Sequence, residues 1–428
     1  MAVGLRLLAK LTSPAEQPAK LMNEIAEWLK QKCSDLVPEI SQTSIDDSPV
    51  IFCHLHPAAE QVKLSLLDSE RLVVSASTSS AGPGYHIFLV SLLKDWALDF
   101  HASWQPPEDE SGDYGDETDY FFAGGEQRVF DSMTSWLQTL AGLFFDGTLD
   151  PNGRGTALGM PVDTHFESDQ LAITPLGPRS REWMLATSQD GNKGKDFSAW
   201  WTPRLDAEYY LGRALNQIWT MVRWRPPVSD SERDLLQSVA DSLSLAYKLD
   251  PTLDYPWAEW NEILELQGTD PPEKDLVRGR VAGKPAMGYR RGNVTVTLTG
   301  GWRIRIPGSF SDFEFNKDHD LFALDPPREI WFTSFRFTKP LSDAAFEAEK
   351  NRLKACQPTY ESEGEHLVAT ATVTEKVRET GEHHFLMNTL NMTPTTKAVC
   401  TIIYPQADQE SWALEIWQSL RPPAVRKT

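Results

Sequence analysis

Cysteine is scarce in this sequence. The 428 residues include four cysteines, Cys33, Cys53, Cys356 and Cys400, and no two of them form a Cys-x-x-Cys pair. This spacing excludes a zinc knuckle and a redox dithiol of the usual kind. Few, widely separated thiols are typical of small hydrophobic residues in a reducing compartment, so we expect a cytoplasmic protein.

Long apolar runs are also missing. No window approaches the roughly 18 uninterrupted apolar residues of a membrane-spanning helix. Arg6 and Lys10 interrupt the short apolar stretch at the N-terminus, and no small-residue cleavage site follows it. We therefore expect no membrane association and no signal peptide. Hydrophobic residues nevertheless make up 40% of the chain and include 15 Trp, which excludes global disorder.

Recognisable catalytic and cofactor motifs are missing as well. The sequence contains no Gly-x-Ser-x-Gly elbow, His-Glu-x-x-His helix or dinucleotide fingerprint. The stretch Ser79 to Gly84 resembles a phosphate loop, but it lacks the Gly-Lys-Ser/Thr ending and favours a tight strand-to-helix turn. His54 and His56 alternate with Cys53, so the three cannot bind one metal from a strand. We expect no cofactor and no metal.

An enzyme with dispersed active-site residues stays open as an alternative, because paired carboxylates come from distant positions in many enzymes. His54, His56 or His86 beside carboxylates of the acidic N-terminal region would form such a site. The structural criterion is a histidine within about 3 Å of a carboxylate in a cleft.

Basic residues are few in the first 150 positions, which hold nine Lys and Arg against 23 Asp and Glu. This balance argues against binding to nucleic acid, because phosphate contacts need clustered Lys and Arg. It favours one basic protein partner, with simple solubility as the alternative. Seven of the acids share one predicted loop and are candidate partner-binding residues: Glu108, Asp109, Glu110, Asp113, Asp116, Glu117 and Asp119. Their spacing does not match a calcium-binding loop.

Two adjacent aromatic residues, Trp200 and Trp201, form a second candidate partner-binding site. They lie in a predicted loop, where an exposed ring can act as an interface anchor. The alternative is that both rings pack beneath the following helix.

The hydrophobic pattern predicts a multidomain α+β protein. Helical spacing at 14–35, 85–99 and 125–145 surrounds strand-like runs at 50–56, 62–67 and 72–77. The predicted organisation is an acidic α+β domain at 1–148, a linker at 149–181, a helical region at 182–266, a second linker at 267–291, and an α+β domain at 292–423.

The C-terminal region begins with the clearest local pattern in the chain. Apolar and polar residues alternate over 294–298 and 302–306, and Gly300-Gly301 between them predicts a hairpin with a two-residue turn. A strand at 330–337, a helix from Ser342, three strands and a helix at 408–420 are predicted to follow.

That order of elements resembles the PsbP/DcrB-like fold over about residues 290–423. Trp302 and Pro307 lie near its start and Trp417-Gln418-Ser419-Leu420 at its end. The resemblance implies an antiparallel sheet flanked by helices and a binding, chaperone or accessory role. The leading hypothesis is a non-catalytic bacterial immunity or effector-accessory, chaperone-like protein that captures one protein partner. A structural adaptor that docks through 182–266 is the other alternative to an enzyme.

Overall fold

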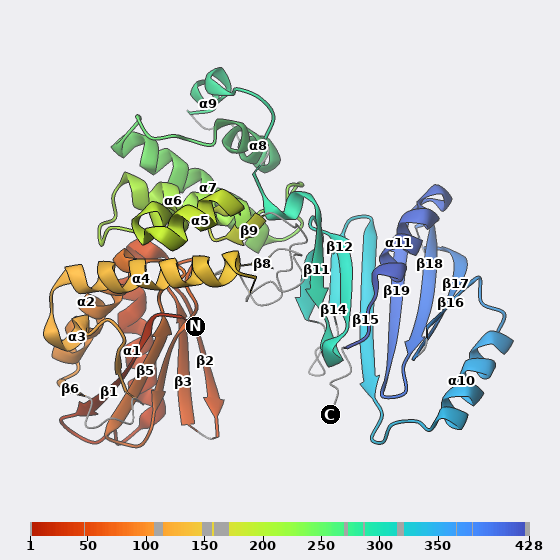
Figure 1. Cartoon of the computed structure of the whole chain (residues 1–428), viewed down its shortest axis with the longest axis horizontal. Coiled ribbons are helices and arrows are strands. Elements are labelled where there is room, and N and C mark those ends of the chain that lie inside the picture. The colour runs from red at the N-terminus through yellow and green to blue at the C-terminus, as the bar shows by residue number, and fades with distance from the viewer. Residues whose placement is uncertain are drawn as a thin grey trace. The chain divides into compact units, whose positions relative to one another are not determined.

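The computed structural model describes residues 2–46, 48–106, 114–147, 156–157, 171–268, 273–285, 287–314, 321–364, 366–378 and 380–423. The chain divides into two compact units, coloured from red to blue-green and from blue-green to blue in Figure 1. Unit 1 contains residues 1–161, 166–222 and 229–288, and unit 2 contains 162–165, 223–228 and 289–428. Helices and antiparallel sheets occur in both, which confirms the multidomain α+β class.

A seven-stranded antiparallel sheet forms one half of unit 1. Its strands run in the order β2-β3-β4-β5-β1-β6, with β7 pairing to β1. The bounds are β1 (Gly4–Leu11), β2 (Glu39–Ile45), β3 (Ser48–His54), β4 (Val62–Leu66), β5 (Arg71–Ser77), β6 (Ala102–Gln105) and β7 (Gly115–Asp116). The apolar N-terminus is thus an interior strand, in which Leu5, Leu7 and Ala9 point into the core while Arg6 and Lys10 point to the other face.

Four helices accompany this sheet: α1 (Pro18–Lys32), α2 (Pro83–Asp99), α3 (Tyr120–Ala123) and α4 (Glu126–Phe145). Ile25 of α1 and Leu89 and Trp96 of α2 are buried in the same apolar cluster as the inward residues of β1. The segment Ser79 to Gly84 follows β5 and runs into the first turn of α2, so the strand-to-helix turn expected from the sequence is confirmed.

The helical half of unit 1 contains α5 (Arg181–Gln189), the 3-10 helix η2 (Gly191–Phe197), α6 (Ala207–Thr220), α7 (Asp230–Leu249), α8 (Trp257–Gln267) and α9 (Lys274–Arg280). A small sheet of β8 (Thr156–Ala157), β9 (Leu171–Thr174) and β10 (Gly177–Ser180) precedes it. Both predicted linkers therefore contain regular structure, β9 and β10 in 149–181 and α9 in 267–291. These elements are too short to produce a clear hydrophobic period.

The ranges 1–148 and 182–266, separated in the sequence-based interpretation, belong to one unit. The segment at 199–202 is one place where the second range packs closely against the first. The amide of Gly84 donates to the Trp200 carbonyl at 3.1 Å, and the amide of Trp200 donates to the Ala81 carbonyl at 2.8 Å. A Cβ on Gly84 would collide with the Thr202 carbonyl, and one on Gly212 of α6 would collide with the Ala199 carbonyl. Glycine at both positions permits this close backbone approach.

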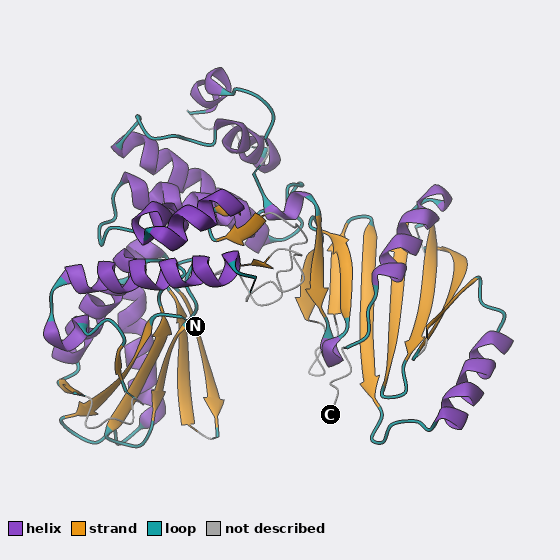
Figure 2. Ribbon diagram, in the orientation of Figure 1, coloured by secondary structure: helices purple, strands orange, loops and turns teal. Residues whose placement is uncertain are grey.

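Unit 2 is built on a second seven-stranded antiparallel sheet, shown in orange in Figure 2, with the order β13-β14-β15-β19-β18-β17-β16. The bounds are β13 (Ser311–Glu314), β14 (Leu321–Asp325), β15 (Arg328–Arg336), β16 (Tyr360–Gly364), β17 (Leu367–Val377), β18 (His383–Met392) and β19 (Thr396–Tyr404). Helix α10 (Asp343–Ala355) follows β15, and α11 (Glu410–Ser419) follows β19. Trp417 of α11 donates to Asn391 of β18 across a buried 3.1 Å hydrogen bond.

The predicted hairpin is present as β11 (Asn293–Thr297) and β12 (Arg303–Pro307), but its turn is longer than predicted. The amide of Leu298 donates to the Trp302 carbonyl at 2.7 Å, which leaves Thr299, Gly300 and Gly301 in the turn. Gly300 and Gly301 have φ of 75° and 81°, values that favour glycine. The turn residues were therefore identified correctly, and the turn length was wrong.

Unit 2 also includes residues 223–228, outside the predicted boundaries of 292–423. Nε of Arg225 donates to the Ser309 carbonyl at 2.7 Å and lies 3.4 Å from Oδ1 of Asp325. In the described ranges no helix is sufficiently long and apolar to cross a membrane.

Candidate functional site

An open cavity of about 450 Å³ lies in unit 1 between α4 and η2. One wall is a row of α4 side chains, Gln127, Phe130, Asp131, Thr134, Ser135 and Gln138. Asn192 and Lys195 of η2 and the neighbouring Trp201 form the rest of the lining. We call this cavity the Trp201 groove.

The α4 wall of the Trp201 groove is a continuous polar stripe on one helix face. Gln127, Asp131, Thr134 and Gln138 are spaced three or four residues apart, which places them one above another. The stripe extends about 16 Å at 1.5 Å per residue. An extended chain rises about 3.3 Å per residue, so the groove matches a segment of about five residues.

Part of the groove lining is aromatic. Trp201 is half-buried, and its ring centroid lies 5.7 Å from that of Phe130. Nζ of the exposed Lys195 lies 5.5 Å from the centroid of the Trp201 ring, within the range of a cation–π contact. Trp201 therefore occupies the kind of site that the sequence indicated, a ring partly open to solvent beside polar side chains.

Trp200 does not share this environment, and its assignment as a partner-binding residue is wrong. Its side chain is 1% exposed and belongs to the core of unit 1. The ring packs among His56, Tyr85 and Tyr209, with centroid distances of 5.6, 5.8 and 4.5 Å. Successive side chains on an extended backbone point in opposite directions, so one of two adjacent Trp rings turns inward.

His56, whose ring packs against Trp200 in this core, is neutral. The amide of Ala58 donates to its Nδ1 at 3.1 Å, which leaves the proton on Nε2. Burial, with smaller contributions from Arg213 and His54, lowers the pKa of His56 to about 3. His54 instead lies at the end of β3 with Nε2 3.0 Å from the Ala59 carbonyl, so the two rings have separate partners.

The acidic loop divides into two parts. Glu108, Asp109, Glu110 and Asp113 lie outside the described residues. The other three acids are described: Asp116 is buried, whereas Glu117 and Asp119 are exposed. Asp116 is therefore not available to a partner, in contrast to the sequence-based expectation.

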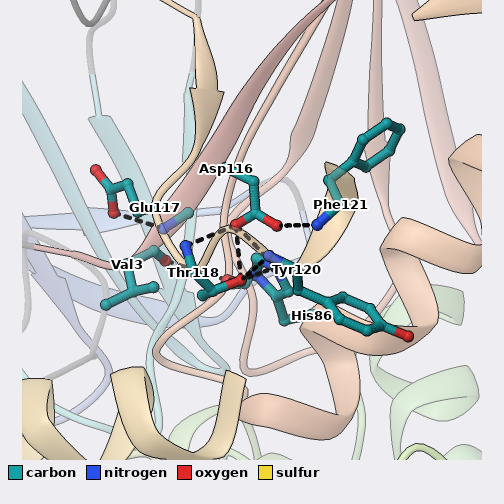
Figure 3. A network of polar contacts seen from close by, with 9 residues as sticks. Val3, His86, Asp116, Glu117, Thr118, Tyr120 and Phe121 are labelled. Carbon is teal, nitrogen blue, oxygen red and sulfur yellow. Dashed lines mark hydrogen bonds and ion pairs between the residues drawn. The ribbon is translucent and has the colours of Figure 1, made fainter. Parts of the chain in front are cut away.

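Asp116 is held in a buried polar network with His86 (Figure 3). Nε2 of His86 lies 3.2 Å from Oδ1 of Asp116 and 3.2 Å from Oγ1 of Thr118, and its Nδ1 lies 2.9 Å from Oγ1 of Thr78. The amides of Thr118 and Phe121 donate to the two Asp116 oxygens, each at 2.8 Å. Burial alone would raise the pKa of Asp116, but His86 and these donors outweigh it and lower the pKa.

This network anchors the end of the acidic loop to the start of the chain. Glu117 accepts a 2.9 Å hydrogen bond from the amide of Gly4, and Thr78 donates to the Val3 carbonyl at 3.1 Å. The pairing of β7 with β1 continues the connection. Although the His86–Asp116 distance approaches the criterion for an acid–base pair, both side chains are fully buried and do not line a cleft.

The described residues contain no group of three or more His, Cys, Asp or Glu side chains arranged to hold a metal ion. No family model matches the sequence, and no curated protein matches it. One matching solved structure is from Bacteroides thetaiotaomicron VPI-5482, with 14% sequence identity and a TM-score of 0.26. The match covers 31% of this chain and 49% of that chain, and at this TM-score it supports no conclusion about fold or function.

Proposed function

We propose that this protein is a non-catalytic, cytoplasmic protein-binding protein that holds an extended segment of one protein partner in the Trp201 groove. The observation that supports this proposal is that two aromatic rings, Trp201 and Phe130, line the groove beside a row of amide and hydroxyl side chains. Nε2 of Gln127 donates to Asp131 and Nε2 of Gln138 donates to the Ser188 carbonyl. Each amide also has an oxygen that can accept from the N–H group of a bound peptide. Aromatic rings supply the anchoring apolar contact.

Charge favours a basic partner. The first 150 residues carry a large excess of acids, and Asp131 presents an exposed carboxylate within the groove. Opposite charge accelerates encounter and selects among partners. We assign the attraction of a basic partner to Glu108, Asp109, Glu110 and Asp113, and not to the buried Asp116.

The resemblance of residues 290–423 to PsbP/DcrB-like proteins supports a specific version of the proposal. Binding, chaperone and accessory roles predominate among such proteins, so we favour an immunity or effector-accessory role in a bacterium. This step rests on analogy of fold, whereas the groove rests on the geometry of this chain.

Site-specific photocrosslinking in host cells tests the proposal. A photoreactive residue replaces Ser135 in the groove, and a matched control replaces Asp234, which is exposed on α7. We expect one crosslinked protein from position 135, none from 234, and loss of the crosslink when Trp201→Ala is added. The Trp201→Ala protein must keep the wild-type melting curve.

Two further outcomes are decisive. Changing Glu108, Asp109, Glu110 and Asp113 to their amides should reduce the yield of the crosslink most strongly at low salt, where steering acts. This variant leaves the Asp116 network in place, which a deletion of 108–119 would not.

A crosslink that is equal at positions 135 and 234, or that survives Trp201→Ala, contradicts the groove as the binding site.

A further inference from the structure

Two charged side chains line the Trp201 groove, Asp131 and Lys195. Both are exposed, and neither forms an ion pair with another residue of the described ranges. The carboxylate of Asp196, next to Lys195 in the chain, lies 3.2 Å from Nε of Arg179 instead. The groove therefore offers a bound segment one carboxylate and one ammonium group that are not already engaged with an opposite charge.

Lys195 indicates which kind of group the Trp201 ring attracts. Its Nζ lies 5.5 Å from the centroid of that ring. The face of an indole ring carries negative charge density and attracts cations. Because an exposed lysine side chain is flexible and weakly held, a cation of the bound segment can replace it. The contact between Lys195 and Trp201 is thus an internal example of the contact that a cationic ligand would make.

Asp131 lies beside this aromatic part of the groove. It follows Phe130 in α4, and Phe130 packs against Trp201 with a centroid distance of 5.7 Å. Oδ1 of Asp131 accepts from Nε2 of Gln127 at 2.8 Å, a bond between residues one turn apart that orients the carboxylate. A carboxylate offers about four acceptor sites, so Asp131 keeps capacity for a ligand. The ring and the carboxylate together favour a cationic side chain.

We propose that the Trp201 groove recognises an arginine of the bound segment, whose guanidinium stacks on Trp201 in place of Lys195 and bonds the carboxylate of Asp131. The inference rests on the proposed function and names the side chain that the groove selects. A guanidinium is planar and weakly hydrated and has five donors, so it can contact a ring with its face and a carboxylate with its edge. The ammonium group of lysine is a strongly hydrated point charge and is the weaker ligand.

Charge favours arginine over an acidic side chain that would pair with Lys195. Acids outnumber bases by more than two to one over the first 150 residues of unit 1, which include α4. This excess attracts a cationic segment and repels an anionic one. The opposite assignment, an acidic residue held by Lys195, predicts the reverse effect of a Lys195 variant and is separated from the proposal by the measurement below.

Short peptides test the recognition directly on the full chain. The probes are acetylated and amidated Ser-Gly-X-Gly-Ser peptides in which X is Arg, Lys, Glu or citrulline, and peptide NMR line broadening gives each Kd. Citrulline has nearly the shape of arginine but no charge. We expect the Arg peptide to bind about threefold more tightly than the Lys peptide and about tenfold more tightly than the citrulline peptide. The Glu peptide should bind more weakly than the Arg peptide.

Three variants assign the contacts. Asp131→Asn should weaken the Arg peptide about tenfold and leave the citrulline peptide unchanged, because it removes a charge-assisted bond. Asn still accepts from Gln127, and Asp234→Asn on α7 is the matched control, with no expected effect. Lys195→Gln should tighten the Arg peptide about threefold, because the competing cation is removed. Trp201→Ala should remove binding of both peptides.

Four results would overturn the proposal: equal affinity for the Arg and citrulline peptides, tighter binding of the Glu peptide, weaker binding of the Arg peptide to Lys195→Gln, or no binding of the Arg peptide up to about 10 mM. Failure of the proposed function gives a different pattern. A Trp201-dependent crosslink at position 135 with no preference for arginine leaves the groove as a binding site and excludes this inference. Binding of the Arg peptide that depends on Asp131, without a crosslinked protein in cells, supports this inference and contradicts the capture of a protein partner.

Discussion

Two buried histidines of unit 1 lie in opposite surroundings. His86 contacts a carboxylate and two hydroxyl groups, whereas His56 contacts three aromatic rings. Both were candidates for chemistry in the sequence, and neither lines a cleft. The distinction depends on Asp116, Thr118 and Trp200, which are remote in sequence and reach these rings only through the fold.

The His56→Asn variant should change how stability depends on pH. In the folded protein the pKa of His56 is lowered to about 3, whereas in the unfolded chain it is about 6.5. The unfolded state therefore binds an extra proton between these values, and His56 costs about 1.4 kcal/mol of stability for each pH unit below about 6.5. Asn can still accept from the amide of Ala58 but does not titrate. The free energy of unfolding of the variant, measured with urea, should therefore fall less steeply than that of the wild type as the pH decreases below about 6.5.

A matched control separates titration from a general loss of stability. His101 is exposed and has a φ of 49°, a conformation that Asn tolerates well. His101→Asn should therefore keep the wild-type slope between pH 6.5 and 4. If His56→Asn is less stable by the same amount at every pH, the assignment of His56 as a buried neutral ring is incorrect.

At the scale of elements, close backbone packing joins the two halves of unit 1. The segment at 199–202 lies against the start of α2 on one side and α6 on the other, and glycine is needed at each contact. Gly82-Pro83-Gly84 was identified from the sequence as a turn, which is correct for the backbone path. Its second role, contact with 199–202, could not be seen because it involves residues more than 100 positions away.

Alanine substitutions should show which glycines are required by packing. A Cβ on Gly84 or Gly212 would collide with a carbonyl group, so Gly84→Ala and Gly212→Ala should each destabilise unit 1 by about 1–3 kcal/mol. Gly142 of α4 is the control, since its Cβ would meet only Ser188 at 4.0 Å. Gly142→Ala should stabilise the helix by about 0.5–1 kcal/mol. Equal effects at all three positions in thermal unfolding would contradict this account.

Much of the secondary structure could be predicted, and the site largely could not. Strong periods revealed α1, α2, α4, α7, β15 and the strands from β17 to β19 within a few residues. Strand β16, between α10 and β17, was not predicted. Strand β1 was missed because two basic residues in a short apolar stretch suggested a terminus rather than an alternating strand. Of the site, Trp201 was identified, but the polar stripe of α4 is an ordinary solvated face in sequence and forms a wall only when η2 packs beside it.

At the scale of the whole molecule, the two units are not two consecutive stretches of the chain. The chain leaves unit 1 after Val222, contributes residues 223–228 to unit 2, and returns to unit 1 at Ser229. Within unit 2, Arg225 makes contact with Ser309, Ser311 and Asp325. A boundary drawn at 292 from composition therefore omits a part of unit 2 that only the three-dimensional contacts identify.

Arg225→Ala should weaken unit 2 and leave unit 1 unchanged. The Arg225 side chain is 10% exposed and Asp325 is 20% exposed, so removing the guanidinium leaves a largely buried carboxylate without this cation. Loss of one member of such a pair costs about 3 kcal/mol. Amide hydrogen exchange should therefore accelerate in β14, which carries Asp325, and stay at the wild-type rate in α7.

The control is Arg233→Ala, which removes an exposed ion pair between residues three positions apart on α7 and should alter neither exchange rate by more than a small factor. Acceleration in α7 together with β14 would show that the two units unfold as one, and an unchanged β14 would show that residues 223–228 do not stabilise unit 2.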